Sequence, residues 1–95
     1  RGGDVTTPEQ LLHIERSDGD LVMVQDSWKG HRFLRITTTK IELEGTTERS
    51  VVLRVSELGP LIRVLTDAQR EIGYTGPHAR VVHERKPART TTSAR

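Results

Sequence analysis

The clearest strand in the sequence is His31-Arg32-Phe33-Leu34-Arg35-Ile36-Thr37-Thr38-Thr39, a segment rich in residues that favour β-structure. Side chains alternate between the two faces of a strand, so Leu34 and Ile36 share one face, and Phe33 and Arg35 share the other. The apolar pair predicts the core side of a sheet. The opposite face then presents an aromatic ring beside a guanidinium group.

Three more strands are predicted around this segment, each bounded by turn residues. The first spans 11–15 and ends at Ser17-Asp18-Gly19-Asp20, where Asp-Gly is typical of a hairpin. The second spans 21–25 and closes at Ser27-Trp28-Lys29-Gly30. The third runs on toward Leu43, and after a turn at 44–47 the fourth spans 50–55. Four consecutive strands joined by tight turns predict an antiparallel meander.

Side chains of the fourth strand alternate between the two faces as in the third. Val51, Leu53 and Val55 are expected on the core side, and Val52 and Arg54 on the opposite face. Arg54 is therefore expected to join Arg35.

The hydrophobic period changes after Val55, and the new spacing predicts a helix over 57–72. Its apolar positions are Leu58, Leu61, Ile62, Leu65, Ala68 and Ile72. Ser56 is the expected N-cap and Gly73 the expected C-terminal cap, while Pro60 is tolerated in the first turn. The predicted fold class is therefore α+β, with a four-stranded antiparallel meander followed by one C-terminal helix.

Charge and composition divide the chain into an arm at 1–9, a domain at 10–73 and a basic tail at 74–95. Residues 1–73 carry ten Lys or Arg and twelve Asp or Glu, whereas the tail carries five basic residues and one acid. A basic tail is either a solvated end or an arm laid along phosphates or a partner. The candidate tail contacts are Arg80, Arg85, Lys86 and Arg89.

The low content of hydrophobic residues indicates a partner, and the composition excludes several classes of site. Only 33% of the 95 residues are hydrophobic and three are aromatic, so a lone copy would be marginally stable. The absence of cysteine excludes disulfides and thiolate metal sites, and four scattered histidines lack ligand spacing. No catalytic cluster or cofactor motif is found, so we expect neither an enzyme nor a cofactor. No apolar run approaches the roughly 20 residues of a membrane span, so a soluble protein is expected.

The face that carries Phe33, Arg35 and Arg54 suits single-stranded nucleic acid, because aromatic rings stack on unpaired bases and Arg contacts phosphate. The same face also suits packing against a second copy of the chain. Trp28 either folds back over its own hairpin or stacks on a ligand.

The block Lys29-Gly30-His31-Arg32-Phe33-Leu34-Arg35-Ile36 resembles one repeat of the purine-rich-element-binding (PUR) family. The segments 49–56 and 57–72 resemble the family's next strand and its helix. More remotely, the layout is similar to the Whirly and transcriptional-positive-cofactor folds, which bind single strands. The resemblance implies that two repeats interlock, so a homodimer or a heterodimer with another single-repeat chain follows. It also singles out Lys29, Arg32, Phe33 and Arg35 as binding residues. The second strand departs from the family pattern, since 21–26 carries no basic or aromatic residue and ends in Asp26.

Together these features predict a dimer that binds RNA or single-stranded DNA through Trp28, Lys29, Arg32, Phe33, Arg35 and Arg54. The alternative is a structural subunit of a ribonucleoprotein assembly, such as a ribosome-like or RNA-processing particle, that docks protein and threads its basic tail along RNA. The sequence leaves open an intracellular location in the cytoplasm or nucleoid, or in a mitochondrion.

Overall fold

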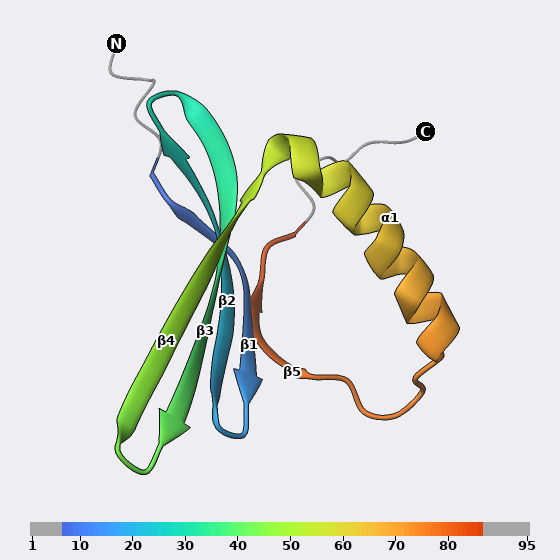
Figure 1. The fold of residues 1–95 in the computed structure, drawn as a ribbon. Helices are drawn as coiled ribbons and strands as arrows, with labels where there is room; N and C mark the ends of the chain where they lie inside the picture. The colour runs from blue at the N-terminus through green and yellow to red at the C-terminus, as the bar shows by residue number, and fades with distance from the viewer. Residues whose placement is uncertain (1–6, 87–95) are drawn as a thin grey trace.

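The computed structural model describes residues 7–86, which form a five-stranded antiparallel sheet and one helix (Figure 1). The elements in chain order are β1 (Glu9–Arg16), β2 (Gly19–Trp28), β3 (His31–Glu42), β4 (Gly45–Arg54), α1 (Val55–Ile72) and β5 (Arg80–Glu84). The strand order across the sheet is β4-β3-β2-β1-β5. The predicted α+β class, with four meandering strands and then a helix, is confirmed.

The fifth strand lies in the segment that the sequence assigned to a basic tail. β5 pairs antiparallel with β1 through partners such as Ile14 and Val81. Two ion pairs flank this pairing, between Arg80 and Glu15 and between Arg85 and Glu9, each with a nitrogen–oxygen distance of 3.0 Å. A strand of five residues with only two valines has little periodicity of its own, because its stability comes from the edge of β1. Of the predicted tail contacts, Arg89 lies outside the described residues.

Tight turns join the first four strands, and each leaves two residues outside the ladder. Trp28 pairs with His31, so the β2–β3 loop consists of Lys29 and Gly30, with φ values of 53° and 80°. Positive φ at both loop positions is the geometry of a type I′ turn, which matches the twist of the flanking strands. Trp28 is therefore the last residue of β2 and not a turn residue.

The helix begins two residues earlier than predicted, so Val55 belongs to α1 and not to the fourth strand. The N-cap is Arg54, and the expected cap at Ser56 was wrong. Because β4 continues into α1 without a loop, a backbone group of the last strand residue needs a partner, and the Arg54 N–H donates to Glu57 Oε1 at 2.9 Å. The predicted cap at Gly73 is confirmed, since its φ is 60° and its N–H donates to the Gln69 carbonyl oxygen at 3.0 Å.

Strand register divides the sheet into two faces, as predicted. The apolar face carries Leu12, Ile14, Leu21, Met23, Leu34, Ile36, Val51 and Leu53. The opposite face, called the arginine face here, carries Phe33, Arg35 and Arg54.

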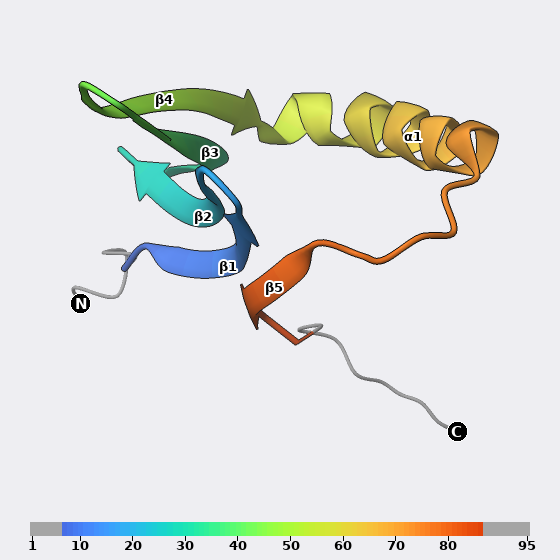
Figure 2. The ribbon, with the colours of Figure 1, turned by 90° about the horizontal axis from the view of Figure 1, so that it is seen from below.

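The helix does not cover the apolar face. α1 contacts only β3 and β4 among the strands, and Figure 2 shows it leading away from the end of β4. Within residues 7–86 no hydrophobic side chain is buried, and Leu65 of the helix is 65% exposed. The hydrophobic stripe of α1 and the apolar face of the sheet are therefore both open in a single copy.

Candidate nucleic-acid interface

Five of the six predicted binding residues line one hollow of about 820 Å³ at the end of the sheet that carries the β2–β3 turn. These are Trp28, Arg32, Phe33, Arg35 and Arg54, and we call the feature the aromatic hollow. The sixth residue, Lys29, adjoins it in the turn.

Register explains why these residues meet. Asp26 of β2, Phe33 of β3 and Arg54 of β4 form one row across three strands, on the arginine face. The next row on the same face holds Arg35, which lies between Val24 and Val52. Side chains of neighbouring rows on one face lie within reach of each other, so the ring of Phe33 is bordered by cations from β3 and β4.

Arg32 lines the aromatic hollow from a different face of the sheet than Phe33 and Arg35. It pairs with Ser27, so its alternation places it with the apolar face. It nevertheless lines the aromatic hollow, at the start of β3. The sequence grouped Arg32 with Phe33 and Arg35 by resemblance, and the sheet joins these residues at a strand end and not on one face.

Both aromatic rings of the hollow have a cation beside them. The Lys29 ammonium lies 4.6 Å from the centroid of the Trp28 ring, and the Arg35 guanidinium carbon lies 6.0 Å from the centroid of Phe33. Trp28 is 65% exposed, whereas Phe33 is half-buried. A tryptophan folded back over its own hairpin would lose most of that surface, so the Trp28 ring is available to stack on a ligand.

An acid offsets part of the positive charge. Arg35 Nη2 lies 3.3 Å from Asp26 Oδ2, and the other oxygen of Asp26 accepts a hydrogen bond from the Ser27 N–H at 2.7 Å. The Asp26 side chain is only 18% exposed, so this pair is partly shielded from water. Lys29, Arg32 and Arg54 therefore supply most of the positive charge at the hollow.

The sequence did not predict the pairing of Asp26 with Arg35. Asp26 was noted only as an acid at the end of the second strand. Alternation places both residues on the arginine face once the two-residue Lys29-Gly30 loop is known, because that loop sets Asp26 opposite Phe33. A prediction of the loop length would therefore have been needed to predict this ion pair.

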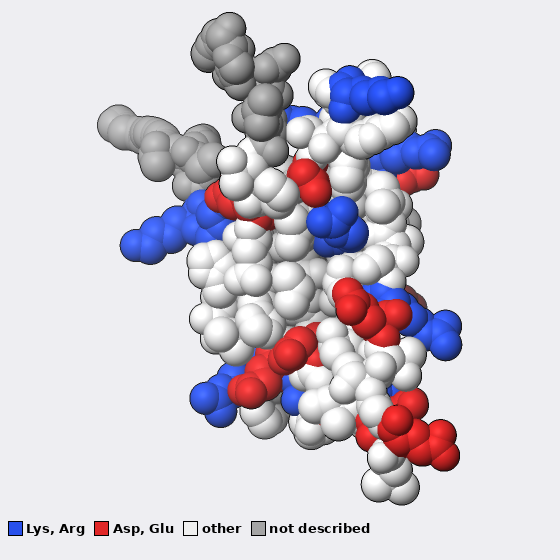
Figure 3. All heavy atoms as spheres, turned by 90° about the vertical axis from the view of Figure 1, so that its left-hand side faces the viewer, with Lys and Arg blue, Asp and Glu red and all other residues white. Residues whose placement is uncertain are grey.

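Charges elsewhere on this side of the molecule are mixed. Figure 3 views the side that turns away from α1, where uncharged atoms occupy the middle and Lys, Arg, Asp and Glu side chains are interspersed around them. Such a surface does not produce a broad positive field, so nucleic acid would have to be held at a local site.

Metal-ligand clusters and membrane-spanning helices are both absent from the described part of the chain. Residues 7–86 contain no group of three or more histidine or carboxylate side chains placed to hold a metal ion. His13 Nε2 lies 3.3 Å from Asp20 Oδ1, but no third ligand joins them. No helix in the described range is long and apolar enough to cross a membrane.

Comparison of the chain with protein-family models, with curated proteins and with solved structures yields no match in any of the three.

Proposed function

We propose that this chain binds single-stranded RNA or DNA in the aromatic hollow and does so as a dimer. The observation that carries the proposal is the convergence of Trp28 and Phe33 with Arg32, Arg35 and Arg54 in one hollow. Unpaired bases would stack on the two rings, at about 1–3 kcal/mol per base. A duplex would not fit this recognition, because its bases are already stacked on each other.

The cations around the rings would contact the phosphates between the stacked bases. Lys29, Arg32 and Arg54 serve this role best, since Arg35 is held by Asp26. Three phosphate contacts on a single strand correspond to a slope of about −2 in log affinity against log salt. The proposed site is thus a short stacking platform with modest salt dependence.

A second copy of the chain is the partner that fits the open apolar surfaces. The apolar face and the stripe of α1 both belong to this chain, so two copies related by a two-fold axis could each cover the other. α1 has 18 residues and is therefore about 27 Å long, enough to cross four strands spaced about 4.8 Å apart. A copy whose hydrophobic side chains stay exposed has little to stabilise it alone.

The alternative role as a ribonucleoprotein subunit has less support. It relied on a basic tail that threads along RNA, but Arg80 and Arg85 are paired with Glu15 and Glu9 along the edge of the sheet. To bind phosphate, each of these cations would first have to leave its glutamate, which costs up to about 1 kcal/mol for an exposed pair.

The test is a titration of a fluorescently labelled single-stranded oligonucleotide, as DNA and as RNA, at two salt concentrations. The double variant Trp28→Ala/Phe33→Ala should weaken binding at least about thirtyfold, because two stacked bases lose their platform. Tyr74→Ala is the matched control, since Tyr74 is 63% exposed and does not line the aromatic hollow. Equal affinity of the double variant and the control, with both folded, would refute binding at the aromatic hollow.

A further inference from the structure

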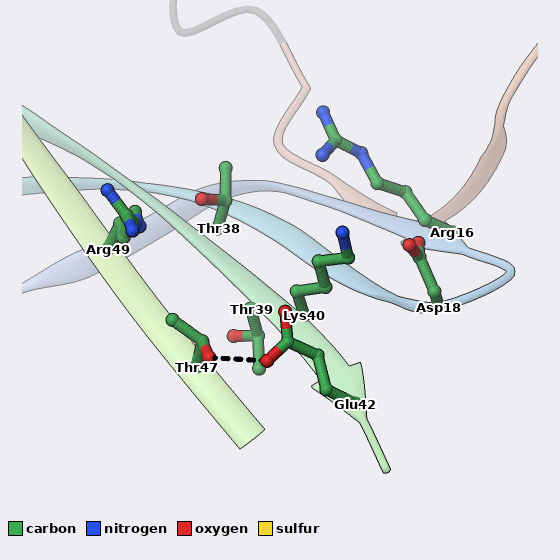
Figure 4. A pocket seen from close by; sticks show the side chains of 8 residues that line it. All are labelled: Arg16, Asp18, Thr38, Thr39, Lys40, Glu42, Thr47 and Arg49. Carbon is green, nitrogen blue, oxygen red and sulfur yellow. Dashed lines mark hydrogen bonds between the residues drawn. The ribbon is translucent and has the colours of Figure 1, made fainter. Parts of the chain in front are cut away.

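A second hollow, of about 430 Å³, lies at the opposite end of the sheet, beside the β1–β2 and β3–β4 turns. We call it the hairpin-end hollow. In Figure 4 the side chains of Arg16, Lys40 and Arg49 rise from three different strands on the same side of the sheet. None of the three lines the aromatic hollow.

Register brings these three cations together. Arg16 of β1, Gly19 of β2 and Lys40 of β3 form one row, so Arg16 and Lys40 flank a residue without a side chain. Their Cα atoms are two strands apart, about 10 Å, which their long side chains can bridge. Arg49 lies diagonally next to Lys40 on β4, because Thr47 is the direct partner of Lys40.

The gap between Arg16 and Lys40 is enforced by the backbone. Gly19 is buried, and a Cβ atom on it would overlap the carbonyl oxygen of Thr39. No other residue fits there without moving β3. The row therefore carries no side chain between Arg16 and Lys40.

The three cations lack carboxylate partners. Within residues 7–86 none of Arg16, Lys40 and Arg49 has a carboxylate oxygen within 4.0 Å, although Arg35, Arg70, Arg80 and Arg85 each do. Glu42 also lines the hollow but accepts a hydrogen bond from the Thr47 hydroxyl at 3.3 Å. Three neighbouring cations on a rigid sheet repel each other, so an anion between them relieves that repulsion.

The charges around the hollow limit what that anion can be. Asp18 and Glu42 border it, so the five charged residues together leave a net charge of +1. A compact dianion can lie among the three cations. A run of several phosphates would extend to Asp18 and Glu42, whose negative charges would repel it. The Thr38 hydroxyl, which shares the face of Lys40 and Arg49, supplies a further donor at the same place.

We propose that the hairpin-end hollow binds a single phosphate group, as a phosphate monoester or the terminal phosphate of a nucleotide or strand. The guanidinium groups of Arg16 and Arg49 would donate paired hydrogen bonds to phosphate oxygens, and Lys40 would add a point charge. This site does not depend on the proposed function at the aromatic hollow.

The proposed site borders the surface that a second copy would cover. Arg49 shares a row with Ile14 and Leu21 of the apolar face, whereas Arg16 and Lys40 lie one row further toward the turns. A helix about 10 Å across, centred on the row of Met23 and Ile36, would end short of Arg16 and Lys40 and lie beside Arg49.

The test is a titration of the full chain with inorganic phosphate, followed by the backbone amide resonances. We expect saturable shifts centred on Arg16, Gly19 and Lys40. The double variant Lys40→Gln/Arg49→Gln should weaken binding at least about tenfold, because two of three charged donors are lost. Arg63→Gln/Arg70→Gln removes the same charge from the helix, outside the hollow, and should change affinity by less than about twofold.

Further measurements show which result would contradict the proposal and keep the two hollows apart. Shifts that spread over all cations without saturation, or a double variant that binds like the helix control, would overturn the proposal. Should the double variant not fold, Lys40→Gln alone serves the same purpose. Trp28→Ala/Phe33→Ala should keep phosphate binding, so failure at one hollow is distinguishable from failure at the other. An oligonucleotide with a 5′-phosphate, compared with the same strand without it and with a small phosphate monoester, tells a strand end from a free monoester as the source of the group.

Discussion

Arg35 of β3 and Asp26 of β2 form an ion pair of 3.3 Å inside the aromatic hollow, between the two strands that carry its aromatic rings. The pair holds the guanidinium near the ring of Phe33 and at the same time offsets its charge. It therefore makes the hollow less positive than its arginine content suggests.

Replacing Asp26 with Asn is expected to strengthen binding of a single-stranded oligonucleotide by about three- to tenfold at low salt. The change removes one negative charge and frees Arg35 for a phosphate, so the salt dependence should also become steeper by about one phosphate contact. The Asn side-chain oxygen can still accept the Ser27 N–H, which limits the cost to the fold. Fluorescence anisotropy at two salt concentrations measures both effects, and a weaker complex would contradict the assignment of Asp26.

Replacing Gly19 with Ala should lower the free energy of unfolding by about 1–3 kcal/mol, because the new methyl group has to displace the backbone of β3. Gly59→Ala is the control of opposite sign. Gly59 lies in α1, its added Cβ would meet only the end of Arg63 at 3.6 Å, and Ala is the better helix former by about 0.5–1 kcal/mol. Urea unfolding followed by circular dichroism compares the two. Equal free energies of unfolding for Gly19→Ala and Gly59→Ala would contradict this prediction, because they would mean that the β3 backbone at Thr39 shifts at little cost.

Replacing Leu65 with Glu should shift the chain from dimer toward monomer or unfolded protein, as seen by light scattering. A buried leucine contributes about 1.5–3 kcal/mol, so the dimer dissociation constant should rise at least about tenfold. Thr66→Glu adds the same charge one residue away, outside the apolar stripe of α1, and should leave the dimer intact. A wild-type monomer that is stable by itself would refute the dimer directly, and a larger complex found only with another chain would favour the heterodimer.

Replacing both Arg80 and Arg85 with Gln should change single-strand affinity by less than about threefold, because both side chains already pair with glutamates of β1. The alternative role, with a tail threaded along RNA, requires a much larger loss. The oligonucleotide titration that measures the aromatic variants decides between them. Circular dichroism of the same variant shows whether the overall fold is retained.

Much of the fold could be predicted because its signals are local. Alternation in His31–Thr39 separated Leu34 and Ile36 from Phe33 and Arg35, and helical spacing located α1 to within two residues. The face that carries Phe33, Arg35 and Arg54 was predicted on the same basis. The N-cap was wrong, since whether Ser56 or Arg54 ends the strand depends on how far β4 stays paired with β3.

Features that join distant parts of the chain could not be predicted. β5 is a strand only because β1 offers an edge more than sixty residues earlier, and its own five residues are too few to show a pattern. The pairing of Arg35 with Asp26, and the meeting of Arg16, Lys40 and Arg49 at the hairpin-end hollow, depend on loop length and strand register. Periodicity is a property of one segment, so the chain alone reveals it. Register results from competition among all pairings of several segments, so the contacts that build both hollows appear only when the sheet is assembled.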